Sequence, residues 1–205
     1  MKFIFTKIYN FRTIVAYNIL KLSKSLILNT ISSLQELLDE LPNCSGDDYV
    51  NIAKQMKIPS EDLQPYAMFS DEAYTRNCVE RTEDYELILL CWEKDQDTPI
   101  HCHNGEECWV YLAEGKLREQ RFQTKNDELV KTADVKMTEE RLSYMNDDLG
   151  YHSLQNIANG RSMSLHLYVA PIDECSAYNP EKGKFEYKDL YYDSIKGEKP
   201  KPELK

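Results

Sequence analysis

Apolar residues recur at helical spacing in the segment 32–41. Four leucines occupy positions i, i+3, i+4 and i+7, which share one face of a helix: Leu34, Leu37, Leu38 and Leu41. Ser33 followed three residues later by Glu36 fits a capping box at the start of this helix. The pattern therefore predicts an amphipathic helix that buries its leucine face.

Two further helices are expected downstream, after Pro42 and Gly46 have interrupted the first. Asp47 or Asp48 is placed to cap the second helix. Its apolar positions are Val50, Ile52, Ala53 and Met56. A short third helix is expected after Ser60, so the chain begins its folded part with a small helical unit.

From about Tyr74 the pattern changes to short β-rich runs separated by turn residues, which predict strands. Glu114 and Gly115 predict the hairpin turn between two of them. Ten short, evenly spaced strands predict an all-β domain built as a barrel or jelly roll. The expected strands are Tyr74–Arg81, Tyr85–Trp92, Pro99–His103, Cys108–Leu112, Lys116–Gln123, Leu129–Ala133, Leu142–Tyr144, His152–Asn156, Met163–Val169 and Phe185–Tyr192.

Length and charge narrow the range of functions. The 205 residues suffice for one sizeable core, and no shift in composition indicates a second domain. With 25 Lys and Arg against 35 Asp and Glu, the formal net charge is −10. Phosphate backbones and anionic lipid surfaces repel such a protein. We therefore expect no nucleic-acid partner and no membrane partner.

The cysteines are spread along the chain rather than clustered: Cys44, Cys78, Cys91, Cys102, Cys108 and Cys175. The chain is larger than a typical disulfide scaffold. It holds no CxxC pair, so neither a zinc ribbon nor a thioredoxin-type redox site is indicated. We expect reduced thiols in a cytoplasmic protein.

The first 35 residues hold no acidic side chain and five basic ones: Lys2, Lys7, Arg12, Lys21 and Lys24. One interpretation is mitochondrial targeting. We favour a solvated or disordered extension, because the serine and arginine content is modest. No apolar run approaches the roughly 20 residues that span a bilayer. We divide the chain into a basic extension at 1–30, one domain at 31–195 and a disordered tail at 196–205.

Two histidines stand one residue apart in the predicted strand Pro99–His103. Successive side chains of a strand alternate faces, so His101 and His103 point the same way. They are either ordinary strand histidines or half of a metal site. The remaining ligands of such a site would come from other strands, and the chain holds only two more histidines, His152 and His166.

The spacing around this pair resembles the motif of the cupin family, His-x-His, three or four residues, Glu, six residues, Gly. Four residues separate His103 from Cys108, and six lead from there to Gly115, so a cysteine stands where the glutamate ligand is expected. Glu107 fits the shorter spacing from His103, although its distance to Gly115 is then one residue too long. Adjacent strand residues face opposite ways, so at most one of Glu107 and Cys108 enters the site.

Further segments narrow the resemblance. They are Tyr74-Thr-Arg-Asn77, Gly150-Tyr-His-Ser-Leu-Gln-Asn156 and Ser164-Leu-His-Leu-Tyr168. The last places Ser164, His166 and Tyr168 on one strand face. In order and spacing, from about residue 30 to about residue 193, the chain resembles the mammalian-type cysteine dioxygenases. The resemblance implies a cupin barrel with a small N-terminal helical cap.

In that family three neutral imidazoles hold Fe(II), and the matching residues here are His101, His103 and His152. Uncharged ligands preserve the 2+ charge that attracts a thiolate, and three of them leave coordination positions open. A carboxylate ligand would weaken this attraction. This gives a physical reason for Cys108 at the position where the cupin motif has glutamate. Cys108 and Tyr168 match the pair that a thioether crosslink joins in the mammalian-type enzymes.

The resemblance also implies a substrate pocket. Arg76 matches the residue that clamps the substrate carboxylate, and a planar guanidinium suits that group bidentately. Tyr74, two residues earlier on the same strand face, lines the same pocket. Ser164 and His166 stand behind Tyr168, where they position its hydroxyl.

The implied activity is a dioxygenase that converts L-cysteine and O2 to cysteine sulfinic acid, in cysteine catabolism toward hypotaurine, taurine and sulfate. One alternative is a dioxygenase of cysteamine or 3-mercaptopropionate. Arg76 argues against it, because relatives that prefer mercaptopropionate-type thiols lack this arginine. The other alternative is a non-enzymatic, metal-binding cupin. We expect a monomer.

Overall fold

The computed structural model describes residues 30–126 and 128–200. The expected basic extension falls almost wholly on residues 1–29, which lie outside the described residues, as do residues 201–205 of the expected tail. The described part of that tail is hydrogen-bonded: Ile195 forms a β-bridge with Glu198, and the Lys196 N–H donates to the Cys78 carbonyl at 2.8 Å. No helix within the described ranges is long and apolar enough to cross a membrane.

Short helices precede a body of strands. The α-helices are α2 (Leu34–Glu40), α3 (Asp48–Gln55) and α4 (Ser60–Leu63), and the 3₁₀ helices are Leu41–Asn43, Gln64–Tyr66 and Asp147–Leu149. The strands are β1 (Thr75–Arg81), β2 (Glu86–Trp92), β3 (Glu107–Glu114), β4 (Lys116–Lys125), β5 (Glu128–Thr138), β6 (Leu142–Met145), β7 (Tyr151–Asn156), β8 (Ser162–Val169), β9 (Glu174–Asn179), β10 (Lys184–Asp189) and β11 (Ser194–Ile195). The prediction of an all-β class with a small helical cap is confirmed.

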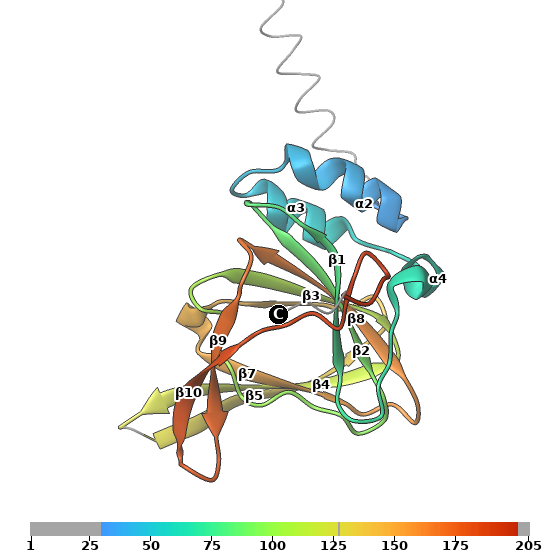
Figure 1. Cartoon of the computed structure of the whole chain (residues 1–205). Coiled ribbons are helices and arrows are strands. Elements are labelled where there is room, and N and C mark those ends of the chain that lie inside the picture. The colour runs from blue at the N-terminus through green and yellow to red at the C-terminus, as the bar shows by residue number, and fades with distance from the viewer. Residues whose placement is uncertain (1–29, 127, 201–205) are drawn as a thin grey trace, which may run out of the picture. The chain divides into compact units, whose positions relative to one another are not determined.

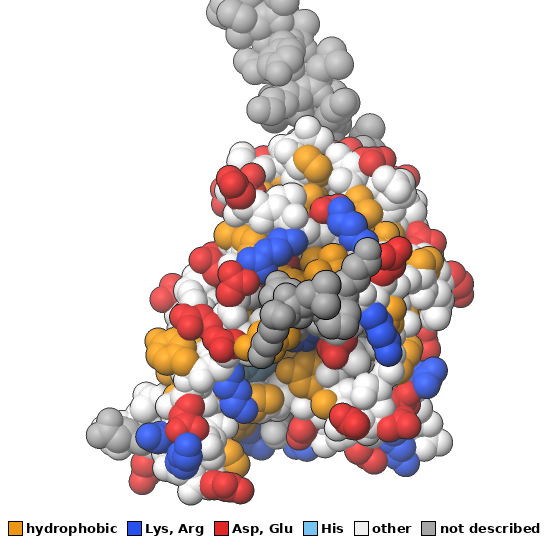
Figure 2. Space-filling view, viewed as in Figure 1, with side chains coloured by type: hydrophobic (Ala, Val, Ile, Leu, Met, Phe, Trp, Pro, Cys, Tyr) orange, Lys and Arg blue, Asp and Glu red, His pale blue; other side chains and the backbone are white. Residues whose placement is uncertain are grey.

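The strands form two facing sheets and a separate hairpin (Figure 1). The larger sheet has the order β11-β1-β2-β8-β3-β6, the smaller one has the order β5-β4-β7, and β9 pairs with β10. The chain passes from one of the two larger sheets to the other after β3, β5, β6 and β7. Two sheets connected in this way enclose one interior, as in the jelly rolls to which the cupins belong. The expected cupin barrel is confirmed. On the face drawn in Figure 2, acidic and basic side chains are interspersed.

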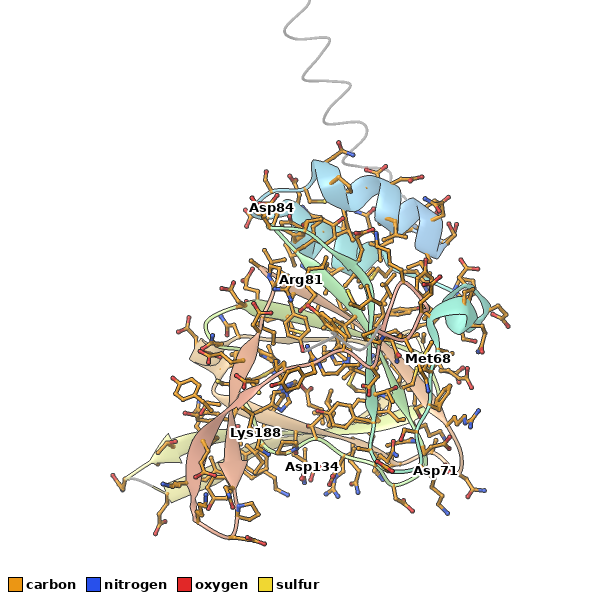
Figure 3. All side chains as sticks on the ribbon, in the orientation of Figure 1. Met68, Asp71, Arg81, Asp84, Asp134 and Lys188 are labelled. Carbon is orange, nitrogen blue, oxygen red and sulfur yellow. The ribbon has the colours of Figure 1, made fainter. Side chains whose placement is uncertain are left out.

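Strand β2 is buried along its whole length because the larger sheet has a core on each side. Leu87 and Leu89 pack with the helices on the outer face, whereas Ile88 and Leu90 belong to the cluster inside the barrel. The period of two that separates the faces of a strand thus divides β2 between the two cores. Figure 3 shows side chains filling the space on both sides of this sheet.

Helix α2 begins where its sequence predicts. Ser33 Oγ accepts the Glu36 N–H at 3.1 Å, and Glu36 Oε2 accepts the Ser32 N–H at 2.8 Å. In the expected capping box Glu36 would accept the Ser33 N–H, whereas it accepts the N–H of the preceding residue, Ser32. The residue before α3 is Asp47, whose side chain makes no capping hydrogen bond. Leu37, fully buried, packs with the outer-face cluster of the larger sheet.

The prediction of a strand at Pro99–His103 is wrong. His101 forms isolated bridges with His152 and Ala177, but the pairing does not extend to either side. Proline has no N–H to give to a ladder. Asn104 and Gly105 then turn the chain with positive φ angles of 55° and 92°. The two histidines therefore lie on one bridge residue and the loop that follows it.

Glu114-Gly115 is not a hairpin turn, contrary to the expectation. β3 pairs with β6 and β8, whereas β4 pairs with β5 and β7, so the chain passes at this point from one sheet to the other. Gly115 has a φ of 87°, and a Cβ there would collide with Ser162. A corner of this kind requires glycine just as a tight hairpin does.

The sequence pattern missed β9 and β11 and extended β10 to Tyr192, whereas that strand ends at Asp189. Strand β9 carries two buried small residues, Cys175 and Ala177, among polar ones. It lacks the β-branched run that identifies a strand. Its importance for the site is that it forms one wall of the pocket described below.

Candidate metal centre and substrate pocket

Three histidines converge inside the barrel. His101 comes from the bridge residue, His103 from the following loop and His152 from β7, and their ligand atoms lie within 4.8 Å of one another. Ring centroids are 4.7 Å apart for His101 and His152 and 4.8 Å apart for His103 and His152. Within the described residues this is the one group of His, Cys, Asp and Glu side chains with the geometry to hold a metal ion.

The hydrogen bonds of the three rings leave nitrogens free for a metal. Both ring nitrogens of His103 are buried without a partner. His101 Nδ1 lies 2.9 Å from the Pro99 carbonyl, and His152 Nδ1 lies 3.0 Å from Glu119 Oε1, which leaves the Nε2 atoms of both rings. Burial, with the neighbouring histidines, lowers the pKa of His101 to about 3 and holds the pKa of His103 well below its ordinary value. Neutral imidazoles with free nitrogens fit a metal ion.

Glu119, on β4, supports the metal group from behind. It is 2 % exposed, and its second oxygen accepts the Ser143 hydroxyl at 2.7 Å and Arg121 Nη2 at 3.1 Å. Burial raises the pKa of this carboxyl, but the hydrogen bonds from His152 and Ser143 and the charge of Arg121 outweigh it, so the pKa is lowered. An ionised carboxylate fixes the tautomer and ring orientation of His152. Glu119 is not among the residues predicted from the sequence, although it shares the inward face of its strand with the buried Leu117.

We expect Glu119→Gln to weaken metal binding about 10- to 100-fold. The amide keeps the shape of the side chain but loses the charge that holds His152 in place. Competition with a chelator of known affinity measures the change. Glu107→Gln is the matched control, because Glu107 is an exposed strand glutamate bonded to Tyr144. Equal metal affinity in both variants would show that Glu119 does not orient the ligand.

A second carboxylate fixes the loop that carries His103. Asp147 Oδ1 accepts the His103 N–H at 2.9 Å, and Asp147 Oδ2 accepts the Gly105 N–H at 2.7 Å. These bonds satisfy backbone groups that a sheet would otherwise pair. Since the partners are over 40 residues apart, no local sequence signal pointed to Asp147.

Cys108 and Tyr168 face each other across adjacent strands, β3 and β8. Both side chains are buried, and the Tyr168 ring centroid lies 5.7 Å from that of His103. Burial raises the pKa of both groups, the thiol and the phenol. Glu107 points the other way and accepts the Tyr144 hydroxyl at 2.6 Å. Of the two neighbours that the sequence left open, it is therefore Cys108 that enters the interior.

Ser164 and His166 lie together next to Tyr168. Ser164 Oγ is 2.8 Å from His166 Nε2, and Trp92 Nε1 donates to the same hydroxyl at 3.0 Å. The His166 and Tyr168 rings are near-parallel, with centroids 6.3 Å apart. The contact between the two rings is one of packing.

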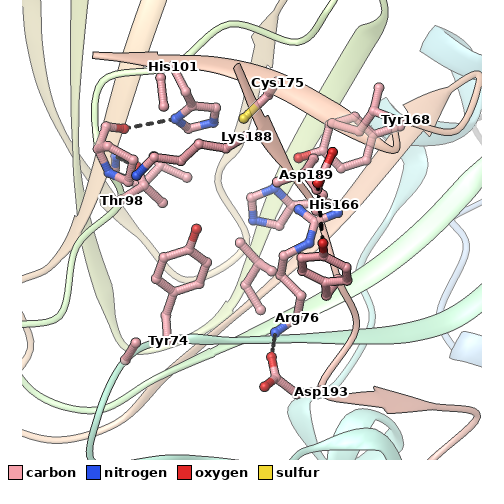
Figure 4. A pocket seen from close by; sticks show the side chains of 18 residues that line it. Tyr74, Arg76, Thr98, His101, His166, Tyr168, Cys175, Lys188, Asp189 and Asp193 are labelled. Atoms are coloured by element: carbon pink, nitrogen blue, oxygen red, sulfur yellow. Dashed lines mark hydrogen bonds between the residues drawn. The ribbon is translucent and has the colours of Figure 1, made fainter. Parts of the chain in front are cut away.

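A cavity of about 320 Å³ opens beside the metal group (Figure 4). Arg76, on β1, lines it with Nε and Nη2 buried and unpartnered, while its backbone N–H donates to Asp193 Oδ2 at 2.7 Å. Tyr74 stacks on Trp92 at a centroid distance of 4.9 Å and lines the same cavity. A buried guanidinium without an acceptor is costly unless a ligand supplies one. His101 lines the cavity as well, so Arg76 and the metal group face the same space.

Comparison with known proteins gives one consistent result. A family model described as "Cysteine dioxygenase type I" matches residues 20–181. Cysteine dioxygenase type 1 of Rattus norvegicus is 32% identical over 165 residues, covering 75% of this chain and 81% of the relative. The Homo sapiens protein of that name is 31% identical over 163 residues, with 74% and 81% covered, and the Danio rerio protein is 27% identical over 184 residues, with 84% and 92% covered.

Solved structures resemble the chain more distantly. A crystal structure of an uncharacterized protein with a double-stranded beta-helix domain from Klebsiella pneumoniae has a TM-score of 0.44 and 12% identity, covering 62% of this chain and 95% of that one. An RmlC-like cupin protein from Desulfovibrio desulfuricans has a TM-score of 0.39 and 16% identity, covering 52% and 91%.

Proposed function

Because this chain belongs to the cysteine dioxygenase type I family, we propose that it holds one mononuclear Fe(II) and converts L-cysteine and O2 to cysteine sulfinate. The observation that carries this proposal is the pairing of three neutral imidazoles with an unpartnered buried arginine at one cavity. Iron, when bound, supplies the electronic coupling that lets triplet O2 react with a thiolate. The choice of Fe(II) rests on the three-nitrogen donor set and its open positions.

His101, His103 and His152 would hold the iron, and none of them adds negative charge. A metal ion held by them would keep its full attraction for a thiolate, so the substrate sulfur would need no other cation to bind in its ionised form. Cys108, at the place of a carboxylate ligand, leaves this charge undiminished.

Arg76 would bind the substrate carboxylate through Nε and Nη2, the two atoms that lack a partner. Holding one end of a small amino acid fixes where its thiol can lie. Tyr74, immobilised by its stacking on Trp92, closes the same side of the cavity. Both oxygen atoms go to sulfur, and the thiolate provides the electrons, so no reductant or 2-oxoglutarate is required.

The experiment that tests this function is oxygen uptake by iron-loaded protein with L-cysteine, cysteamine and 3-mercaptopropionate in parallel. We expect uptake and sulfinate formation with L-cysteine, and much weaker responses to the other two. Uptake with another thiol but not with L-cysteine would make the substrate wrong. Failure of the purified protein to acquire near-stoichiometric iron would instead support a non-enzymatic cupin.

We propose that Cys108 and Tyr168, which are opposite each other in register on β3 and β8, form a thioether crosslink. The bond joins the sulfur to a ring carbon ortho to the hydroxyl, and two electrons and two protons pass to O2. We expect intact mass to fall by about 2 Da after turnover, and Cys108→Ser to abolish this shift. Cys91→Ser is the control, because Cys91 is equally buried but belongs to the outer-face cluster. A shift that persists without Cys108 would exclude this pair.

The cellular setting follows from the same proposal. Sulfinate formation would commit cysteine to catabolism toward hypotaurine, taurine and sulfate. All six cysteines are free thiols, which fits a reducing, cytoplasmic location. We propose that the protein acts as a monomer.

A further inference from the structure

A second cation lines the substrate cavity at its outer end. Lys188, on β10, is paired in register with Cys175 of β9, and both residues line the cavity that contains Arg76. Figure 4 shows the Lys188 side chain running from beside Cys175 across the cavity toward Thr98. Its position on the hairpin is labelled in Figure 3. Unlike Arg76, Lys188 is exposed to solvent.

The second feature of Lys188 is that its charge is not paired. Within the described part of the chain, no carboxylate lies within ion-pair distance of its ammonium group. The two acids of the cavity wall, Asp189 and Asp193, hydrogen-bond to neutral donors and keep their charge: Asp193 accepts the Arg76 backbone N–H at 2.7 Å, and Asp189 accepts the Tyr191 hydroxyl at 3.3 Å. The ammonium group therefore stands without an ion-pair partner on the wall of the cavity that His101 also lines.

This local charge opposes the field of the whole protein. The formal net charge of −10 repels anions from the surface, and a cation at the mouth of a cleft counteracts that repulsion locally, against the charges of Asp189 and Asp193. Small thiols differ in the charge that they bring to this mouth with the thiol protonated: 3-mercaptopropionate carries −1, zwitterionic L-cysteine carries 0 and cysteamine carries +1.

We propose that Lys188 sets the charge preference of the cavity mouth, favouring anionic over cationic thiols. The inference deepens the proposed function, on which it rests for the class of ligand. Arg76 recognises a carboxylate once the ligand is seated, whereas Lys188 acts on the net charge of the approaching molecule. The two opposite charges of zwitterionic L-cysteine largely cancel in their interaction with Lys188 during approach. Lys188 therefore affects the binding of L-cysteine least.

The test measures binding separately from turnover. Dissociation constants of 3-mercaptopropionate and cysteamine are determined by calorimetry with iron-loaded protein under anaerobic conditions, for the wild type, Lys188→Gln and Lys188→Glu. We expect Lys188→Gln to lower the preference for 3-mercaptopropionate over cysteamine by about 5- to 30-fold, because each ligand responds oppositely to the lost charge. Lys188→Glu should lower it further, and rising salt should reduce the difference between the proteins.

Lys184→Gln is the matched control, because Lys184 is an exposed lysine on the same strand that does not line the cavity and lies 3.8 Å from Glu186. Its binding preference should equal that of the wild type. An unchanged preference in both Lys188 variants, or an equal change in Lys184→Gln, overturns the inference. If the preference shifts as expected but no thiol supports oxygen uptake, the proposed function is wrong while the role of Lys188 stands.

Discussion

His103→Ala should reduce bound iron from near-stoichiometric to background and remove cysteine oxidation with it. Loss of a residue that only supports a metal ligand typically costs 10- to 100-fold in affinity or activity, so loss of a ligand itself should exceed about 100-fold. His103 is the most informative choice among the three, because both of its ring nitrogens are buried without a hydrogen-bond partner among the described residues. Elemental analysis of the purified variant and oxygen uptake measure the two effects.

The matched control for this experiment is His166→Gln. His166 is equally buried and lies in the same interior, but its Nε2 is bonded to Ser164 and it does not belong to the metal group. This variant should retain iron. If His103→Ala retained iron, His103 would not be a metal ligand. If both variants lost iron equally, the loss would reflect general disruption of the barrel interior.

Strand alternation was the most informative signal in the sequence. It separated Cys108 from Glu107 and put Ser164, His166 and Tyr168 on one face, and the structure places them so. The same rule was wrong at residues 99–103, where one bridge residue and a turn replace the strand. There His103 enters the metal group because Asp147 holds its backbone, and such a contact leaves no periodic trace.

The remaining differences have physical causes of the same kind. Gly115 was predicted as part of a hairpin turn but lies at a corner between the two sheets. The sequence does not separate the two cases, because both need a glycine with positive φ. Strand β9 is short and polar, and its two inward residues are small. Glu119 had a usable signal, because a charged residue stands at an inward position of a strand, where an unpaired charge would be costly.

Arg76→Gln should chiefly impair the use of L-cysteine. Truncating one partner of a buried charge pair costs about 2–5 kcal/mol, which corresponds to a loss of about thirtyfold to several thousandfold in kcat/KM. The reason is that Nε and Nη2 of Arg76 are buried without an acceptor among the described residues. The substrate carboxylate would accept the hydrogen bonds that these two atoms lack. Steady-state oxygen uptake gives kcat/KM, while iron content should stay at the wild-type level because Arg76 is not in the metal group.

Two comparisons separate loss of the carboxylate contact from general damage. Arg118→Gln removes an exposed arginine that is bonded to Asp134 outside the cavity, and its kcat/KM should not change. Cysteamine lacks the carboxylate, so any slow oxidation of this thiol should be unaffected or improved by Arg76→Gln. An unchanged kcat/KM for L-cysteine would show that the carboxylate binds elsewhere. An equal loss for cysteamine would show that Arg76 maintains the cavity rather than recognising the substrate, because only a direct contact depends on the group that distinguishes the two thiols.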